Sequence, residues 1–257
     1  MLLGSIVPLK ALRITVPAIV LKALAFMAGL EFMTFNPLVG SVVAGAIFVM
    51  GFVLAGVISD YKEAEKMPGE LRSVLDRIWT EARLLHMSKP EFDVEQVRLR
   101  LLKILRSFIE GVEQKRGYSG LEPCVESVEG LSDTIAEMEK VGAAPVAISR
   151  VKDGRENLLK NILRIYYMQR TVYLPSARIL SEVLMLGVIL MLIFVKSQSL
   201  VETLLMFSVI TYFIVYLRYL TYTLDTPFRQ GERTQDDVSL FLLKEFEKKL
   251  AKPEAKV

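Results

Sequence analysis

The sequence is poor in the residues that most often build metal centres and catalytic sites. It contains a single cysteine, Cys124, and a single histidine, His86. One cysteine excludes an intrachain disulfide and a multi-cysteine metal site, and one histidine excludes most His-based metal and catalytic schemes. The sequence also has no glycine-rich phosphate loop and no nucleophile elbow. We therefore expect a protein that is not an enzyme and that needs neither a cofactor nor a metal.

The charge balance excludes a second class of function. The formal net charge is only +3, which is too small to indicate nucleic-acid binding. Apolar residues make up 52% of the chain even though charged residues still make up 24%. The apolar residues must therefore be concentrated in a few long segments while the charges gather elsewhere. This composition is typical of a membrane protein with a substantial aqueous part.

Hydropathy predicts four membrane spans, because about 20 apolar residues in a helix cross the hydrocarbon core. In chain order, the spans are residues 14–35, 32–59, 179–195 and 200–217. Short connections pair them into two antiparallel hairpins, the first hinged at Pro37. The predicted organisation is an N-terminal transmembrane hairpin over 1–59, a cytosolic helical region over 60–178, a C-terminal transmembrane hairpin over 179–218 and a cytosolic tail over 219–257.

Lysine and arginine set the expected orientation. They are frequent in the middle region and in the tail, whereas the two hairpin connections contain only Lys196. By the positive-inside rule, we expect a multi-pass protein of the cell membrane with both termini cytoplasmic. The first apolar segment is interpreted as a retained span and not as a signal peptide, because it continues directly into a second span. Its Lys22 has two interpretations, a lysine that reaches back to the interface or a functional lysine in a conduit.

The aqueous part is predicted to be helical, because apolar residues recur at helical spacing and no long stretch alternates. The expected helices cover 69–87, 94–114 and 120–141, and a further helix starts at about Val151 and is kinked at Pro175 before the third span. Another helix is expected over 238–250. Asp236 and Asp237 precede it, and their default role is to cap it. A cation site at this pair is the alternative, although two adjacent carboxylates are too few to support calcium binding.

Two passages at the membrane exits carry a family resemblance. The second span contains the step Gly51-Phe52 and runs into Glu63-Ala64, and the fourth span ends in Asp225-Thr226-Pro227-Phe228. Together with the stretch 166–175, these passages resemble the bestrophin ion-channel family. The departures are Tyr61-Lys62 where the family has paired tryptophans, and no dense acidic run directly after Pro-Phe. The resemblance therefore does not extend to calcium gating.

The resemblance implies an all-α, bestrophin-like membrane protein that assembles as a homopentamer. In this family the second helices line a narrow apolar neck, and alignment on the Gly-Phe step puts Ala44, Phe48 and Phe52 at the neck positions. These residues are spaced i, i+4 and i+8, so they share one helix face. The alternative is that this face meets lipid or a neighbouring helix. An apolar ring of this kind gates by dewetting.

The expected function is a channel that passes small monovalent ions. Glu31, Lys196 and Glu202 are expected in the outer vestibule. Two acids and one cation give a slightly negative local potential, which favours cation passage weakly, and anion passage is the alternative. The expected partners are monovalent ions, membrane lipid and the other copies of the chain in a homopentamer, and no nucleic acid is expected. Two alternatives come from other classes: a small membrane transporter, in which Glu182 and Arg218 form a paired site, and a membrane scaffold that binds a cytosolic partner.

Overall fold

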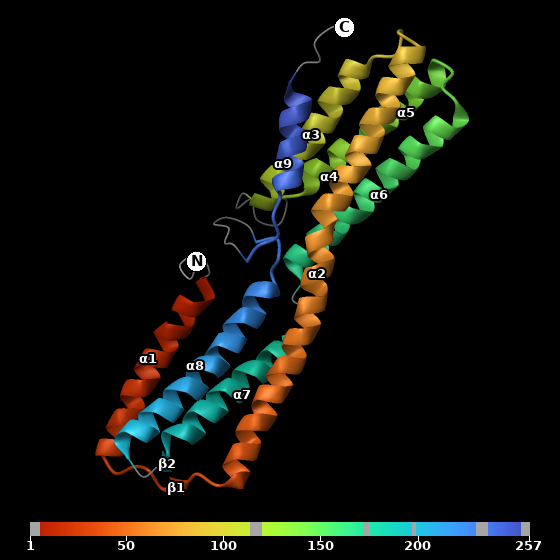
Figure 1. Ribbon diagram of the computed structural model, residues 1–257. Coiled ribbons are helices and arrows are strands. Elements are labelled where there is room, and N and C mark those ends of the chain that lie inside the picture. The colour runs from red at the N-terminus through yellow and green to blue at the C-terminus, as the bar shows by residue number, and fades with distance from the viewer. Residues whose placement is uncertain (1–5, 114–119, 172–174, 197–198, 230–235, 253–257) are drawn as a thin grey trace. The chain divides into compact units, whose positions relative to one another are not determined.

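The computed structural model describes residues 6–113, 120–171, 175–196, 199–229 and 236–252. These residues form helices and two very short strands, labelled in Figure 1. The chain divides into two compact units. Of the described residues, the first contains 6–61, 175–196, 199–226 and 236, and the second contains 62–113, 120–171, 227–229 and 237–252.

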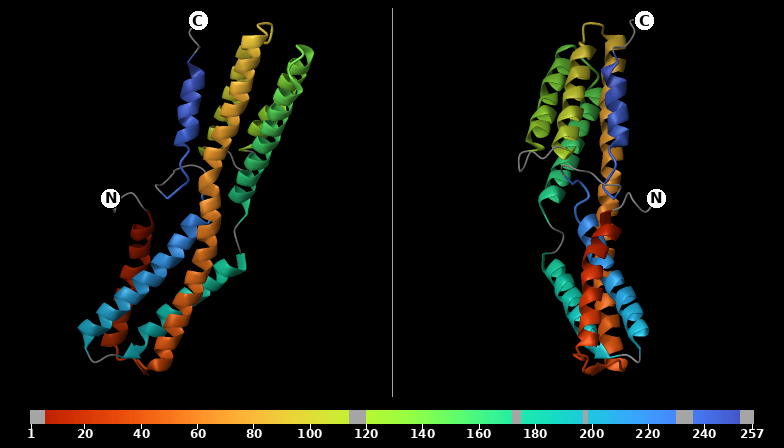
Figure 2. Two further views of the ribbon diagram at one scale, coloured as in Figure 1. Left: turned by 45° about the vertical axis from the view of Figure 1, so that its right-hand side comes forward. Right: turned by 90° about the vertical axis from the view of Figure 1, so that its left-hand side faces the viewer.

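The first unit is a set of long apolar helices with a small parallel sheet at one end. Its elements are α1 (Ile6–Met27), β1 (Met33–Thr34), the first part of α2 (Pro37–Ser88), α7 (Pro175–Ile193), β2 (Val195–Lys196) and α8 (Leu200–Leu224). Helices α1 and α7 both pack along α8. Strands β1 and β2 pair through Met33 with Val195 and Thr34 with Lys196, close to the start of α2 in every view (Figure 2).

Three helical stretches are long and apolar enough to cross a membrane: Pro37–Ser88, Pro145–Ile193 and Leu200–Leu224. The second includes residues 172–174, which lie outside the described residues. The three stretches confirm an all-α membrane protein. Helix α1 is not among the three, and it carries Lys10, Arg13 and Lys22. The fourth span therefore stays a prediction.

Local signals explain where the first two helices end and begin. Gly29 adopts a φ of 66°, and the N–H of Leu30 donates to the carbonyl of Ala25 at 3.0 Å. This left-handed glycine ends α1, so the expectation that the helix continues to residue 35 is wrong. Helix α2 begins at Pro37, the predicted hinge, and not at residue 32, and the Asn36 side chain accepts a hydrogen bond from the N–H of Val39 at 3.0 Å.

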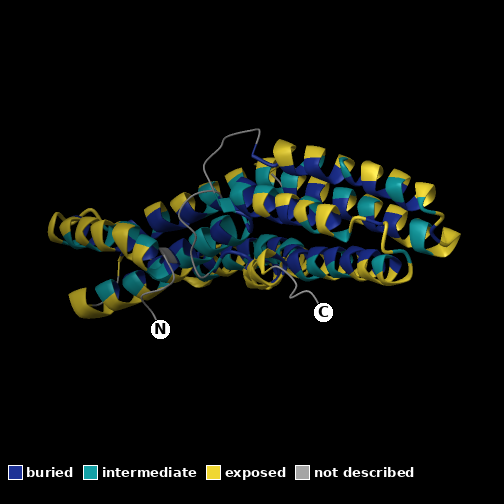
Figure 3. Ribbon diagram, turned by 90° about the horizontal axis from the view of Figure 1, so that it is seen from above, coloured by how far each residue is buried: buried dark blue, intermediate teal, exposed yellow. Residues whose placement is uncertain are grey.

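The second unit is a bundle of amphipathic helices. Besides the second part of α2 it contains α3 (Val94–Glu113), α4 (Glu122–Glu129), α5 (Leu131–Lys140), α6 (Pro145–Arg170) and α9 (Phe241–Ala251). Helix α3 packs against α4 and α9, and α6 packs against α4 and α5. Figure 3 shows the resulting pattern, with buried residues on the faces turned to neighbouring helices. The predicted apolar stripe of α3 is confirmed as buried: Val97, Leu101, Ile104, Leu105, Phe108 and Val112.

The predicted helix over 69–87 is not a separate element, because α2 runs without a break from Pro37 to Ser88. It passes through Pro68, which removes a backbone hydrogen bond and ordinarily ends or kinks a helix. The buried residues Ala64, Met67 and Leu71 continue one stripe across this proline. Packing of that stripe in the second unit outweighs the local cost of Pro68.

Two further helix boundaries differ from the expectation. The helix predicted over 120–141 is divided into α4 and α5 at Gly130. Helix α6 begins at Pro145, before Val151, because proline fits the first position of a helix. Helix α6 ends at Arg170 and α7 begins at Pro175; because residues 172–174 lie outside the described residues, the kink at Pro175 stays a prediction.

The short C-terminal helix also begins later than predicted, at Phe241 with Leu240 as its N-cap residue. Asp236 and Asp237 therefore do not cap it, and the capping role is wrong. Asp237 instead forms an ion pair with Arg229, at 3.9 Å, inside the second unit. Asp236 is grouped with the first unit.

Gly111 marks a close approach of backbone to backbone in the second unit. A Cβ at this position would lie 2.3 Å from the carbonyl oxygen of Gly120. We expect Gly111→Ala to destabilise the protein by about 1–3 kcal/mol through overpacking, measured as a lower melting temperature. Gly69→Ala is the matched control, because its Cβ would meet only Leu242, at 3.9 Å, and alanine favours a helix. Equal melting temperatures for the two variants would contradict the prediction.

The segment after α8 docks in the second unit through Phe228. Its side chain is only 2% exposed, and its carbonyl accepts a hydrogen bond from the Gln169 side chain at 3.1 Å. The carbonyl of Pro227 accepts from the N–H of Val238 at 3.0 Å. We expect Phe228→Ala to lower the melting temperature of the purified protein, because the cavity costs about 3–5 kcal/mol. An unchanged melting temperature would show that this segment contributes little to stability.

Candidate functional site

The part of α2 in the first unit has two distinct faces. Val39, Val43, Ala46 and Met50 are buried against the other helices of the unit. The opposite face is apolar as well, yet it is exposed. Phe48 and Phe52 are the largest residues on it, with exposed fractions of 75% and 76%. Helix α2 therefore buries one apolar face and presents a second one that its own unit does not cover.

Ala44, Phe48 and Phe52 lie together on this exposed face, as their spacing requires. They do not pack against another helix of the same unit, so a neighbouring helix that covers them would have to come from a second copy of the chain. Either lipid, a second copy of the chain or an aqueous pore must face them. Lining of a pore stays a prediction.

Glycines on α2 leave room for another helix to approach. A Cβ at Gly45 or Gly51 would meet nothing within 4 Å, and at Gly40 it would meet only a Phe35 ring atom, at 4.0 Å. Glycine is therefore not required here by contacts within the chain. Small residues on a membrane helix permit close contact between helices of different chains.

Lys22 occupies a buried site in the first unit, where its side chain is 1% exposed. The two interpretations of it, a lysine that reaches the membrane interface and a functional lysine in a conduit, both stay predictions. The Lys22 ammonium pairs with Glu31 and donates to the carbonyls of Ile193, at 3.0 Å, and Val195, at 2.6 Å. These three bonds use all the donors of an ammonium group. Lys22 therefore ties the end of α1 to the end of α7 and to β2.

The three predicted vestibule residues have different environments. The Glu31 side chain is only 6% exposed and is paired with Lys22, so its charge is compensated. Lys196 is exposed in β2, and Glu202 is exposed in the first turn of α8. Glu202 also lines a cavity of about 220 Å³ at this end of the first unit, together with Lys22.

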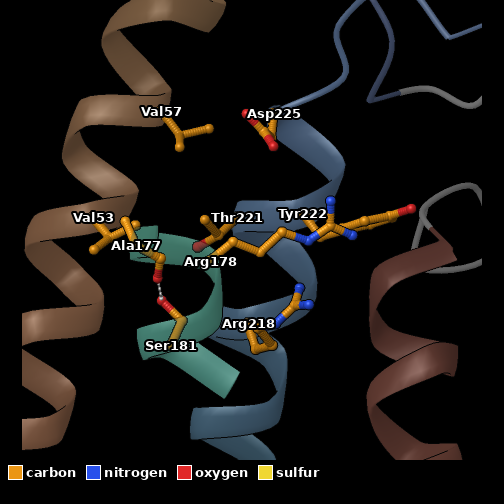
Figure 4. A pocket seen from close by; sticks show the side chains of 9 residues that line it. All are labelled: Val53, Val57, Ala177, Arg178, Ser181, Arg218, Thr221, Tyr222 and Asp225. Atoms are coloured by element: carbon orange, nitrogen blue, oxygen red, sulfur yellow. Dashed lines mark hydrogen bonds between the residues drawn. The ribbon is translucent and has the colours of Figure 1, made fainter. Parts of the chain in front are cut away.

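Two arginines lie near one tyrosine, Tyr222, where α7 begins and α8 ends (Figure 4). The guanidinium carbon of Arg178 lies 4.3 Å from the centre of the Tyr222 ring, and that of Arg218 lies 5.5 Å from it. Arg218 also forms an ion pair with Glu182 of α7. Sequence reasoning found the Glu182 and Arg218 pair but missed Arg178. The one feature of the sequence that could have pointed to Arg178 is its position as the cation directly before the third apolar run.

The lone cysteine is buried and the lone histidine lies within hydrogen-bond distance of a backbone carbonyl. Burial raises the pKa of the Cys124 thiol to about 12, so the thiol stays protonated and unreactive at neutral pH. The Nδ1 atom of His86 lies 2.7 Å from the carbonyl oxygen of Phe92, across the turn between α2 and α3. In the described ranges, no three histidine, cysteine or acidic side chains gather closely enough to hold a metal ion.

Neither a protein-family model nor a curated protein matches the sequence. Solved structures do match. A bacterial bestrophin homologue from Klebsiella pneumoniae is 16% identical over 95% of this chain and 96% of its own, with a TM-score of 0.68. A point variant of a bestrophin homologue from the same organism gives 15% identity, the same coverage and the same TM-score. A membrane protein with a glycine-to-alanine substitution is 15% identical over 93% of this chain and 96% of its own, with a TM-score of 0.73.

The chain has a bestrophin-like fold. The structural match confirms the resemblance drawn from the Gly51-Phe52 step and from Pro227-Phe228, and it extends over nearly the whole length of the chain. At identities of 13–17% across such structures, it is the fold that is shared. The two most distinctive features of the first unit are the exposed apolar face of α2 and the charged residues near the ends of α7 and α8.

Proposed function

We propose that this chain is one subunit of an ion channel that passes small monovalent ions through a central pore lined by α2. The observation that carries the proposal is the exposed apolar face of α2, centred on Phe48 and Phe52 in a bestrophin-like fold. An exposed apolar face of this kind either contacts lipid or becomes covered on assembly. Around an axis of symmetry, the same face from each subunit forms a ring.

The mechanism follows from the chemistry of that ring. Phenylalanine side chains offer a hydrated ion neither a charge nor a hydrogen bond, so a narrow ring of them excludes water and blocks conduction. Widening the ring admits water, and ions then follow. Ala44, one turn before Phe48, adds a smaller apolar ring. In this account the neck controls whether ions pass and selects only weakly by their charge.

The outer charges contribute little selectivity in this account. Lys22 compensates Glu31, which removes one of the two acids expected to favour cations. Glu202 and Lys196 have opposite charges, and both are exposed. Their potentials largely offset each other and are screened by salt. We therefore propose a channel with weak charge selection that conducts without bound calcium and performs no enzymatic reaction.

The assembly we propose is a homopentamer in the cell membrane, with four spans per subunit and both termini cytoplasmic. The positive-inside distribution of Lys and Arg and the bestrophin-like fold support this arrangement. The mass of the detergent-solubilised particle, corrected for bound detergent, tests it. The expected mass is five times the 29.0 kDa of one chain. A monomer or dimer as the only stable species would contradict the pore.

The transporter alternative depends on Glu182 and Arg218 acting as a paired transport site. In the structure, Arg218 is also stacked on Tyr222, and this contact gives the pair a role in holding α7 to α8. Symmetry-related broken helices, the usual sign of a transporter, are not evident in the described helices of the first unit. The channel is therefore the function that the structure supports best.

A further inference from the structure

A cavity lies at the end of the first unit that carries β1 and β2. It has a volume of about 220 Å³. Apolar side chains form most of its wall: Phe35, Leu192, Met206, Phe207 and Ile210. Protein interiors are close-packed, and an apolar cavity of about 150 Å³ is large enough to bind benzene. A cavity of this size therefore fits a molecule with about six carbon atoms.

The buried cation in the wall offers this cavity no bond. The three donors of the Lys22 ammonium are taken by Glu31 and by the carbonyls of Ile193 and Val195. The carboxylate of Glu31 also neutralises the charge of Lys22. A ligand in the cavity gains neither a donor nor a net positive charge from this pair.

Glu202 is the remaining charged group of the wall. It lies three residues after Ser199, whose side chain accepts a hydrogen bond from the N–H of Glu202 at 3.2 Å. Serine and glutamate at this spacing form a capping box when the carboxylate bonds back to the serine N–H. In the described part of the chain, the Glu202 carboxylate makes no such bond and pairs with no cation. It is free to receive a ligand.

Thr203, beside it, supplies the second polar group. Its side chain lines the same cavity, the residue is 5% exposed, and its hydroxyl has no hydrogen-bond partner among the described residues. An unmade hydrogen bond at a buried hydroxyl costs free energy, which a ligand in the cavity can recover. The wall thus combines a large apolar surface, one hydroxyl and one carboxylate.

We propose that this cavity binds a small amphiphilic cation, an alkylammonium of about six carbons. The apolar body fills the space between Met206, Phe207 and Ile210, and the ammonium donates to the Glu202 carboxylate. An anionic head group is disfavoured, because the only charged group of the wall without an ion pair among the described residues is the Glu202 carboxylate. Binding at this site does not require the chain to conduct ions, so it stands or fails separately from the proposed channel.

Three probes of equal length test the proposal: hexylammonium, hexanol and hexanoate. Each is titrated calorimetrically into the full chain in nanodiscs of zwitterionic lipid, with empty nanodiscs as the reference. We expect saturable binding in the order hexylammonium, hexanol, hexanoate, with hexylammonium favoured about tenfold over hexanol by its charge-assisted hydrogen bond. Equal affinities for the three probes, or titrations that match those of empty nanodiscs, would overturn the proposal and indicate partition into lipid alone.

Two variants locate the site. Glu202→Gln, at an exposed position, is expected to reduce hexylammonium binding about tenfold, to the level of hexanol, and to leave hexanol unchanged. Met206→Trp fills the cavity and should weaken binding of hexylammonium and of hexanol alike. Glu65→Gln is the control, because it removes the same charge from an exposed position of the second unit. An equal loss of hexylammonium binding in Glu202→Gln and Glu65→Gln would overturn the assignment to this cavity.

Discussion

Replacing both Phe48 and Phe52 with alanine is expected to raise the conductance of the channel severalfold, or to make spontaneous opening frequent. The two rings are the largest side chains on the exposed face of α2. Removing them from every subunit at once widens the neck and lets water enter it, which lowers the barrier to a hydrated ion. The ratio of cation to anion permeability should change little, because no charge has been altered. Recording wild type and the double variant in asymmetric salt gives both quantities.

The control for this experiment is Phe213→Ala, which removes an exposed ring from α8. It should leave both conductance and opening at the wild-type level. If Phe48 and Phe52 face lipid, the double variant will behave like Phe213→Ala in these recordings. Unchanged currents from a correctly assembled double variant would therefore contradict the assignment of this face to the pore.

Replacing Lys22 with methionine is expected to destabilise the protein by about 3–5 kcal/mol, the usual cost of removing one partner from a buried ion pair. The substitution leaves the buried Glu31 carboxylate without its cation and leaves the carbonyls of Ile193 and Val195 without their donor. The melting temperature of the purified protein measures the effect. Arg13→Met is the matched control, because Arg13 is an exposed cation on the same helix.

A double variant separates the charge from the packing. Lys22→Met combined with Glu31→Gln removes both charges, so the unpaired carboxylate is no longer present. We expect the double variant to melt at a higher temperature than Lys22→Met alone, with a destabilisation smaller than the sum of the two single variants. A double variant that is as destabilised as that sum would show that the pair is not coupled, contrary to the geometry.

The features that could be predicted from the sequence are those that depend on neighbouring residues. The buried stripe of α3 follows from apolar residues at helical spacing. The start of α2 follows from Asn36 and Pro37. The bestrophin-like fold could be recognised from Gly51-Phe52 and from Pro227-Phe228, because the order of residues in a short passage is visible in the sequence itself.

The features that could not be predicted depend on contacts between distant residues. The sequence shows a lysine in an apolar helix, but the carbonyl of Val195, which Lys22 binds, is 173 residues away. The continuity of α2 through Pro68 depends on burial of Met67 and Leu71 in the second unit. Local propensity alone favours a break there.

The neck assignment lies between these two cases. The spacing of Ala44, Phe48 and Phe52 places them on one face, and the structure leaves that face exposed. No contact within the described part of one chain shows whether lipid, a second copy or a pore meets this face. For this reason the oligomeric mass and the recordings test it more directly than any contact within one chain.

Single-channel recording of the purified wild-type protein in planar bilayers tests the central claim most directly. The account predicts discrete unitary current steps carried by monovalent ions, with a reversal potential in asymmetric salt that indicates weak charge selection. A transporter would give no unitary steps, and a scaffold would give no current. Bilayers that stay electrically silent with correctly assembled pentamers would contradict the claim that this chain forms a channel.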